Sequence, residues 1–416
     1  MSEPPEPPGP RAGVARSTLS IVAPGAAMIA VTFGLARYGY GLLLPEMRED
    51  LGMSAGAAGL IASSAYVSYL AGNTAVVWLL GRYGVRLPIG LAALAAAVGM
   101  TVLGVAQTVP VLATGVLLAG VSAGLAFPPY ADVVAQEVRP ARQDVAWSAV
   151  SSGTGWGVAL AGPAAIALGG EWRTVWLLFA VLAVLVGVVA VGAAPKASPV
   201  SLDGPRLRWS WFVCPRSGPL LASAVLVGAG SSVWWAFGVD AMRAADIGPD
   251  AARAVYAGCG AAGVLASATG LVTNRFGLRR IHLVACVAVV AAFVLLSFDA
   301  AGLSGAVVAA VLFGVSYNGV IATQGLWSAG VFAERPSAGL AAVSTALTVG
   351  TIAGPAVAGL VIDAFGFAPA LLGAGVVLAV ATLLLPPRSE PRAALVVAAT
   401  SVARSPSISR SRVRRD

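Results

Sequence analysis

Residues 81–86 read Gly-Arg-Tyr-Gly-Val-Arg, and residues 274–279 read Asn-Arg-Phe-Gly-Leu-Arg. Each stretch is a short basic loop between two long apolar runs. A match of six residues can arise by chance, but flanking segments repeat at nearly the same spacing, since residues 120–122 and 314–316 both read Gly-Val-Ser. The chain is therefore predicted to contain two copies of one unit, each mostly embedded in a membrane.

The composition identifies the apolar runs as membrane spans. Hydrophobic residues make up 58% of the 416 residues and charged residues only 11%, with a mean hydropathy of +0.86, whereas soluble domains carry about 25% charged residues. Twelve apolar stretches of about 18–25 residues are each long enough to cross the hydrocarbon core as a helix. They lack the alternation of a membrane β-barrel. The predicted fold class is an all-α polytopic membrane protein whose twelve transmembrane helices form two pseudo-symmetric six-helix bundles.

The predicted organisation has two bundles, residues 21–194 and 219–387, joined by a cytoplasmic linker at 195–218. A disordered cytoplasmic N-terminus, residues 1–20, precedes them, and a basic, disordered cytoplasmic tail, residues 388–416, follows them. The predicted spans are 21–45, 56–79, 88–107, 110–134, 146–168, 174–194, 219–240, 255–273, 281–298, 304–328, 338–361 and 369–386.

The positive charges predict the orientation in the membrane. The net charge is +8, and the basic residues gather in the tails and in the loops of one face. Those on the opposite face are Arg48, Arg173, Arg243 and Arg253. The positive-inside rule then places both termini in the cytoplasm and the protein in the cytoplasmic membrane. The charge distribution does not call for a nucleic-acid partner; we expect a monomer in the lipid bilayer, without a cofactor.

The second basic loop resembles the loop between the second and third helices of each half in the major facilitator superfamily, whose pattern is Gly-x-Leu-Ala-Asp-Arg-x-Gly-Arg-Arg. Asn274 stands where the family has Asp, and Gly81 takes that place in the first loop. The resemblance covers about residues 20 to 387, and it implies a transporter that works by alternating access. The positions that fit the pattern are Gly270, Arg275, Gly277 and Arg279.

Arg37 is the most distinctive candidate for a functional residue. It lies within the first predicted span, roughly 12 Å of helix before Pro45. An arginine inside hydrocarbon costs about 2.5–3.5 kcal/mol on insertion scales, so it should face the bundle interior or water. Its surroundings, residues 33–45, resemble the first helix of the poorly characterised bacterial YbfB/YjiJ-like branch of the family. Two interpretations remain open: an anchor for a substrate anion, or a structural tie held by an internal partner or by backbone carbonyls.

Further polar and aromatic side chains fall near the centres of predicted spans. The family resemblance implies that the first, fourth, seventh and tenth helices line the cavity. This makes Tyr317, Asn318 and one of Trp234 and Trp235 candidate lining residues. An interhelical hydrogen bond is the alternative role for each tyrosine. The predicted substrate-binding residues are Arg37, Tyr66, Trp156, Trp234, Tyr317 and Asn318.

The repeated loops suggest a gate at the cytoplasmic face. Asp132, near the cytoplasmic end of the fourth span, is placed to pair with Arg82 or Arg86. A proton-coupled carrier usually holds a titratable carboxylate in the membrane, but no Asp or Glu lies in the middle of any predicted span. We therefore interpret Asp132 as part of a gate and not as a proton site, and we expect His282 at the membrane interface. The predicted gating residues are Arg82, Arg86, Asp132, Arg275 and Arg279.

These features predict a secondary active transporter that moves a small organic solute, by efflux coupled to the proton gradient. Uptake of a small organic anion, or facilitated diffusion, is the first alternative, and a non-transporting membrane sensor or scaffold on the same fold is the second. An enzyme is not expected, because the sequence has one histidine and no carboxylate at membrane depth. An ATP-driven pump is not expected either, because the sequence has no Gly-x-x-x-x-Gly-Lys-Ser/Thr loop.

Overall fold

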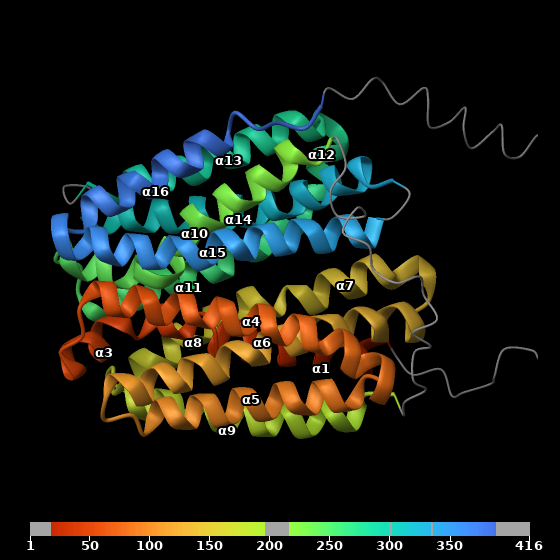
Figure 1. The fold of residues 1–416 in the computed structure, drawn as a ribbon, viewed down its shortest axis with the longest axis horizontal. Coiled ribbons are helices and arrows are strands. Elements are labelled where there is room, and N and C mark those ends of the chain that lie inside the picture. Colours follow the sequence, from red (N-terminus) through yellow and green to blue (C-terminus); the bar gives the residue numbers. More distant parts are fainter. Residues whose placement is uncertain (1–17, 196–215, 299–301, 334–335, 388–416) are drawn as a thin grey trace, which may run out of the picture.

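The computed structural model describes residues 18–195, 216–298, 302–333 and 336–387. The predicted N-terminal segment, linker and tail lie almost entirely outside the described residues. Within them the chain is helical, and Figure 1 shows the helices running side by side.

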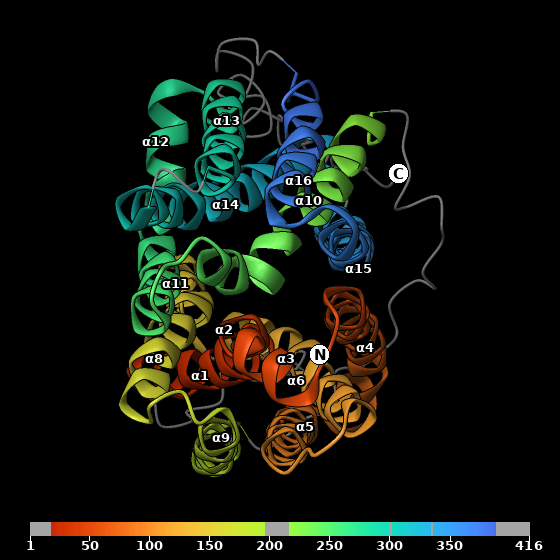
Figure 2. The same ribbon diagram turned by 90° about the vertical axis from the view of Figure 1, so that its left-hand side faces the viewer.

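The first half contains α1 (Thr18–Ile29), η1 (Ala30–Leu35, a π-helix), α2 (Gly39–Leu42), α3 (Leu44–Leu51), α4 (Ala55–Tyr83), α5 (Arg86–Gly104), α6 (Val109–Glu137), η2 (Pro140–Arg142), α7 (Gln143–Ser151), α8 (Gly153–Ala167) and α9 (Trp172–Ala193). The second half contains α10 (Gly218–Ala244), α11 (Pro249–Gly263), η4 (Val264–Ala268), α12 (Thr269–Phe276), α13 (Leu278–Leu296), α14 (Gly302–Val331), α15 (Pro336–Phe365) and α16 (Phe367–Ala381). In Figure 2 the helices of the two halves form two groups that face each other.

Ten helical segments of the described residues are long and apolar enough to cross a membrane. The other two predicted spans are shorter in the structure. The fifth is divided at Ser152 into α7 and α8. The twelfth forms α16, which ends at Ala381. The all-α polytopic class is confirmed, and two of the twelve predicted spans fall below the length of the others.

The prediction of one continuous first helix over residues 21–45 is wrong. The α-helix changes into a π-helix after Ile29, and residues 36–38 form a turn before α2 begins. Two backbone bonds of the π type mark this change, from Ala36 N to Val31 O at 2.8 Å and from Tyr38 N to Phe33 O at 3.0 Å. Such single π segments are frequent at functional sites.

Small residues let the helices within each half approach closely. A side chain at Gly153 or Gly157 would overlap the backbone of the first helix, at Ala26 and Ala30 respectively. In the second half, Gly354 of α15 takes the same role against α10. Close backbone approach gains van der Waals contact, which drives helix association in lipid.

Two seams join the halves. In the first, α4 packs on α15: a side chain at Gly59 would overlap the carbonyl of Pro355, and Ala356 N donates to the hydroxyl of Ser63 at 3.1 Å. In the second, α8 packs on α11, and a Cβ on Gly155 would lie 2.7 Å from the carbonyl oxygen of Gly260. In Figure 1, α4 and α15 lie together at the end where α3 lies and separate toward the other end.

Candidate functional site

The break in the first helix is fixed by close backbone packing on both sides. A side chain at Gly34 would overlap the backbone of Gly157 in α8. A side chain at Gly41 would overlap the carbonyl oxygen of Trp235 in α10, which belongs to the other half. Glycine allows both contacts because it has no Cβ. The segment between these contacts, which includes Arg37, is therefore held between the two halves.

The guanidinium of Arg37 lies among aromatic rings. Its Cζ is 4.4 Å from the ring centre of Tyr69 and 4.6 Å from that of Tyr66. Phe33 and Tyr38 lie at 5.4 and 5.6 Å. Ring faces attract a cation, but Nε of Arg37 is buried without a hydrogen-bond partner, and no carboxylate of the described residues forms an ion pair with it. The rings hold the guanidinium in place and leave its charge without a counter-ion in the part of the chain that the structure describes.

A cavity of about 20 Å³ adjoins Arg37, which is room for about one water molecule. Both halves contribute to its wall. The lining residues are Arg37, Tyr38, Tyr40, Ala62, Ala65 and Tyr66 from the first half, and Trp235 and Ala236 from α10.

Trp235 connects the rings of the two halves. Its ring centre is 4.2 Å from that of Tyr38, with the planes tilted by 32°. On its other side it meets Tyr317 edge to face at 5.8 Å, and Tyr317 stacks on Phe313 at 5.3 Å. Aromatic pairs at such distances contribute about 0.5–1.5 kcal/mol beyond their burial. A continuous aromatic surface therefore runs from Arg37 into α14.

The structure places the predicted site residues in different surroundings. Tyr66 lines the cavity. Tyr317 does not line it but contacts the ring of Trp235, which does. Trp234 is fully buried in the second half, stacked on Phe313 at 4.5 Å, and it does not line the cavity. The cavity-facing member of the tryptophan pair is Trp235.

Two further predicted residues also lie away from the cavity. Trp156 is 51% exposed, on the same face of α8 as Leu160. Asn318 donates to the carbonyl of Gly314 in its own helix at 2.9 Å and faces Gly263 of α11. His282, four residues after the start of α13, is buried, with Nδ1 2.8 Å from the hydroxyl of Thr323. Its position at the membrane interface stays a prediction.

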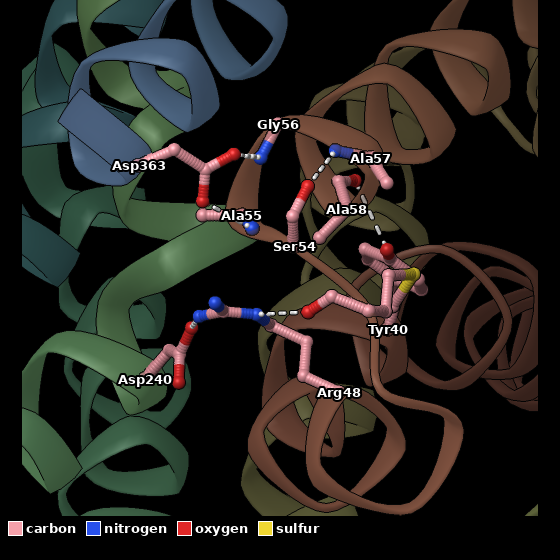
Figure 3. Close-up of polar contacts among 10 residues, drawn as sticks. Tyr40, Arg48, Ser54, Ala55, Gly56, Ala57, Ala58, Asp240 and Asp363 are labelled. Carbon is pink, nitrogen blue, oxygen red and sulfur yellow. Dashed lines mark hydrogen bonds and ion pairs between the residues drawn. The ribbon is translucent and has the colours of Figure 1, made fainter.

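Charged side chains join the halves at one end of the molecule, which we call the α3 end because α3 lies there. Arg48 of α3 pairs with Asp240 of α10 (Figure 3). Glu46 accepts from Arg243 at 2.9 Å and from Arg253 at 2.8 Å. The Arg253 side chain is only 4% exposed and also pairs with Asp250 of its own helix at 2.8 Å, so one carboxylate from each half holds this buried cation.

The N-terminus of α4 is capped by residues of both halves (Figure 3). Asp363 of α15 accepts the backbone N–H of Ala55 at 2.8 Å and that of Gly56 at 2.7 Å. The hydroxyl of Ser54 accepts the N–H of Ala57 at 3.1 Å. The first N–H groups of a helix have no partner within the helix, and an anion is favoured there by the helix dipole. Asp363 therefore closes the first seam at the α3 end.

At the α3 end of the second seam the charged side chain is a cation, Arg253, whereas in the first seam it is the anion Asp363. Gly170, in a left-handed conformation with φ of +78°, follows the C-terminal end of α8, and a Cβ there would collide with the guanidinium of Arg253. Cations are favoured at helix C-termini. In each seam, therefore, a charged side chain of the second half lies at the end of a helix of the first half: Asp363 at α4 and Arg253 at α8.

The predicted gating arginines each lie within their own half. Arg86 donates to the carbonyl of Ala194, the C-cap of α9, at 2.9 and 3.0 Å, and Arg279 donates to that of Pro386 at 3.0 Å. Arg82 and Arg275 lie next to the rings of Tyr83 and Phe276 respectively. Among the described residues, Asp132 forms no ion pair. The predicted gate is therefore not assembled in this structure.

Comparisons with known proteins agree with this geometry. The family model described as "Uncharacterised MFS-type transporter YbfB" matches residues 29–386. A variant of the nucleoside transporter NupG superimposes with a TM-score of 0.75 and 12% identity, covering 87% of this chain and 98% of that one. A bacterial homologue of the human lysosomal transporter Spinster, in an inward-facing and unoccupied conformation, gives 0.74 and 15%, with 89% and 97% coverage. No curated protein matches.

Proposed function

The chain belongs to the major facilitator superfamily, in the group of the MFS-type transporter YbfB, and from this membership we propose that it carries a small organic anion across the cytoplasmic membrane by alternating access. Proteins of this superfamily are transporters and not enzymes. The observation that carries the proposal is the charge of Arg37, which lies beside a cavity walled by both halves without a counter-ion among the described residues.

The chemistry of the site supports an anion. Arginine stays protonated at physiological pH and offers donors in a planar fork that matches a carboxylate or phosphate. Tyr38, Tyr66 and Trp235 add flat surfaces on which an organic group can rest. The cavity is too small for such a substrate in this state, so binding requires the two halves to move relative to each other.

We propose that the α3 end faces the outside and that the termini lie in the cytoplasm, because the positive-inside rule assigns the two repeated loops to the cytoplasm. On this assignment the structure is closed to the outside, and Arg82, Asp132 and Arg275 would meet only in the opposite state. Reporter fusions between Ser198 and Leu202, and after Arg388, test this assignment. A reporter active on the outer side at either position would overturn it.

Efflux coupled to the proton gradient is the direction favoured by the sequence, and uptake of the anion is its alternative. The described residues around Arg37 offer tyrosine hydroxyls and no carboxylate for a coupled proton. Proton coupling is therefore tested separately from anion binding.

The test is untargeted metabolite accumulation in right-side-out and inverted vesicles, each with and without a proton gradient. We expect organic anions to accumulate in one orientation, and Arg37→Ala to abolish this. Arg37→Lys keeps the charge but loses the fork, and should transport poorly. The matched control is Arg173→Ala, because Arg173 pairs with Asp50 within the first half at 2.7 Å, away from the cavity. Full transport by Arg37→Ala, or accumulation of cations only, would refute the proposal. No transport of any solute would favour a sensor.

A further inference from the structure

Tyr256 of α11 is a buried tyrosine whose hydroxyl bridges the two halves. It is 1% exposed, and its ring meets that of Trp235 edge to face at 5.9 Å. Its hydroxyl lies 3.0 Å from the carbonyl oxygen of Tyr38 and 3.1 Å from that of Trp235. Tyr38 belongs to the first half and Trp235 to the second.

Both carbonyls flank the candidate site. Tyr38 follows Arg37 in the turn between η1 and α2, where the regular helical pattern is interrupted. The carbonyl of Trp235 also faces Gly41, where a side chain would overlap it. A single hydroxyl thus fixes the interrupted backbone of the first helix against α10, one residue away from the guanidinium.

A tyrosine hydroxyl has one hydrogen, so Tyr256 shares it between two acceptors. One acceptor lies in its own half and stays in place when the halves rock as rigid bodies. The other, the carbonyl of Tyr38, lies in the first half, so a rigid-body opening of the α3 end would separate it from the hydroxyl. The hydroxyl keeps a partner in either state, whereas the carbonyl of Tyr38 is bonded by it only while the α3 end is closed.

We propose that Tyr256 is a positioning residue of the transport site, whose hydroxyl holds the Arg37 turn against the second half only in the state closed at the α3 end. The inference rests on the proposed alternating-access function. Its predicted effect concerns the balance between the two states, because the bond to Trp235 is present in both. Only the bond to Tyr38 distinguishes them.

The chain offers a closely matched pair of variants. Tyr256→Phe removes the bridging hydroxyl and keeps the ring. Tyr130→Phe removes a hydroxyl of the first half that is also buried but has no hydrogen-bond partner among the described residues. A cysteine at Ala62, which lines the cavity, reports access through labelling by a membrane-impermeant maleimide applied to each face of vesicles. Labelling of the parent without Ala62→Cys is subtracted, and Glu49→Cys, at an exposed position of α3, identifies the face at the α3 end.

Loss of one net hydrogen bond changes a population ratio by about fivefold. We expect Tyr256→Phe to raise the labelling rate from the α3 face by about this factor, with no rise from the opposite face, and Tyr130→Phe to match the parent. An unchanged rate in Tyr256→Phe would overturn the inference. So would a rise from both faces with a lower melting temperature, because that pattern marks general loosening. The labelling needs no substrate, so it can succeed or fail independently of the vesicle transport assay.

Discussion

The carboxylate of Asp363 accepts the backbone N–H of Gly56 at 2.7 Å, which joins the segment just after the eleventh predicted span to the start of the second. The two residues belong to different halves. The bond forms only when those halves meet at the α3 end, so it is a direct link between one backbone amide and the conformational state of the whole molecule.

We expect Asp363→Asn to weaken the closure of the α3 end. The variant removes the negative charge at the N-terminus of α4, which is worth about 0.5–1 kcal/mol at an exposed helix end, or a two- to fivefold change in the population ratio. Labelling of a cavity cysteine from the α3 face measures it. Asp50→Asn is the control, because Asp50 pairs with Arg173 inside one half. Equal labelling in the two variants would show that Asp363 does not contribute to closure.

Gly59→Ala should push the halves apart at the first seam. The new methyl group would overlap the carbonyl of Pro355, and overpacking of this kind costs about 1–3 kcal/mol. The state open at the α3 end relieves the overlap, so its share should rise fivefold or more in the same labelling assay. Gly373→Ala is the control, because a side chain there meets no atom of the described residues within 4 Å. Equal labelling rates in Gly59→Ala and Gly373→Ala would contradict the inference that contact between Gly59 and Pro355 closes the α3 end.

Trp234→Leu and Trp235→Leu should have different effects. Trp234 is fully buried against Phe313, so its loss should lower the free energy of unfolding by about 2–4 kcal/mol, which a melting curve detects. Trp235 lines the cavity, so its loss should raise the KM of transport. It should lower the melting temperature less than Trp234→Leu does. If the KM changes for Trp234→Leu alone, the cavity has been assigned to the wrong tryptophan.

The double variant Arg82→Ala with Arg275→Ala should favour the state seen here. In this structure both arginines lie against rings of their own half, so their loss removes no contact between the halves. In the opposite state they are proposed to meet Asp132, Glu137 or helix C-termini across the cytoplasmic face. Labelling of the cavity from the cytoplasmic side should therefore rise without unfolding. An unchanged labelling rate would show that these two arginines do not stabilise the state closed to the cytoplasm.

The fold was predictable because long apolar runs admit few arrangements in lipid. The repeated loops that contain Arg82 and Arg275 indicate two related halves, and the family resemblance agrees with the structure. Arg37 also stood out in the sequence, because a charge at membrane depth is rare.

The details of the site were not predictable to the same degree. Trp234 and Trp235 are adjacent, and the sequence does not specify how their helix is rotated about its axis. The contacts of Asp363 with α4 and of Arg253 with Glu46 join residues far apart in the chain, so they follow only from the packing of whole bundles. The break beside Arg37 has one signal in the sequence, the density of glycines around it, but a run of apolar residues with glycines is also compatible with a continuous helix.

The two seams have a consequence for the internal repeat. Ala55 is the first residue of α4 and Pro249 is the first residue of α11, the corresponding helix of the second half. Ala55 donates its backbone N–H to Asp363, whereas proline has no N–H to donate, and the second seam ends on Arg253 instead. The halves are thus related in shape and complementary in chemistry. A protein built by fusing two identical copies of the second half would lack, in both seams, one of the two amides that Asp363 accepts, so the divergence of the duplicated units is itself part of how the molecule closes.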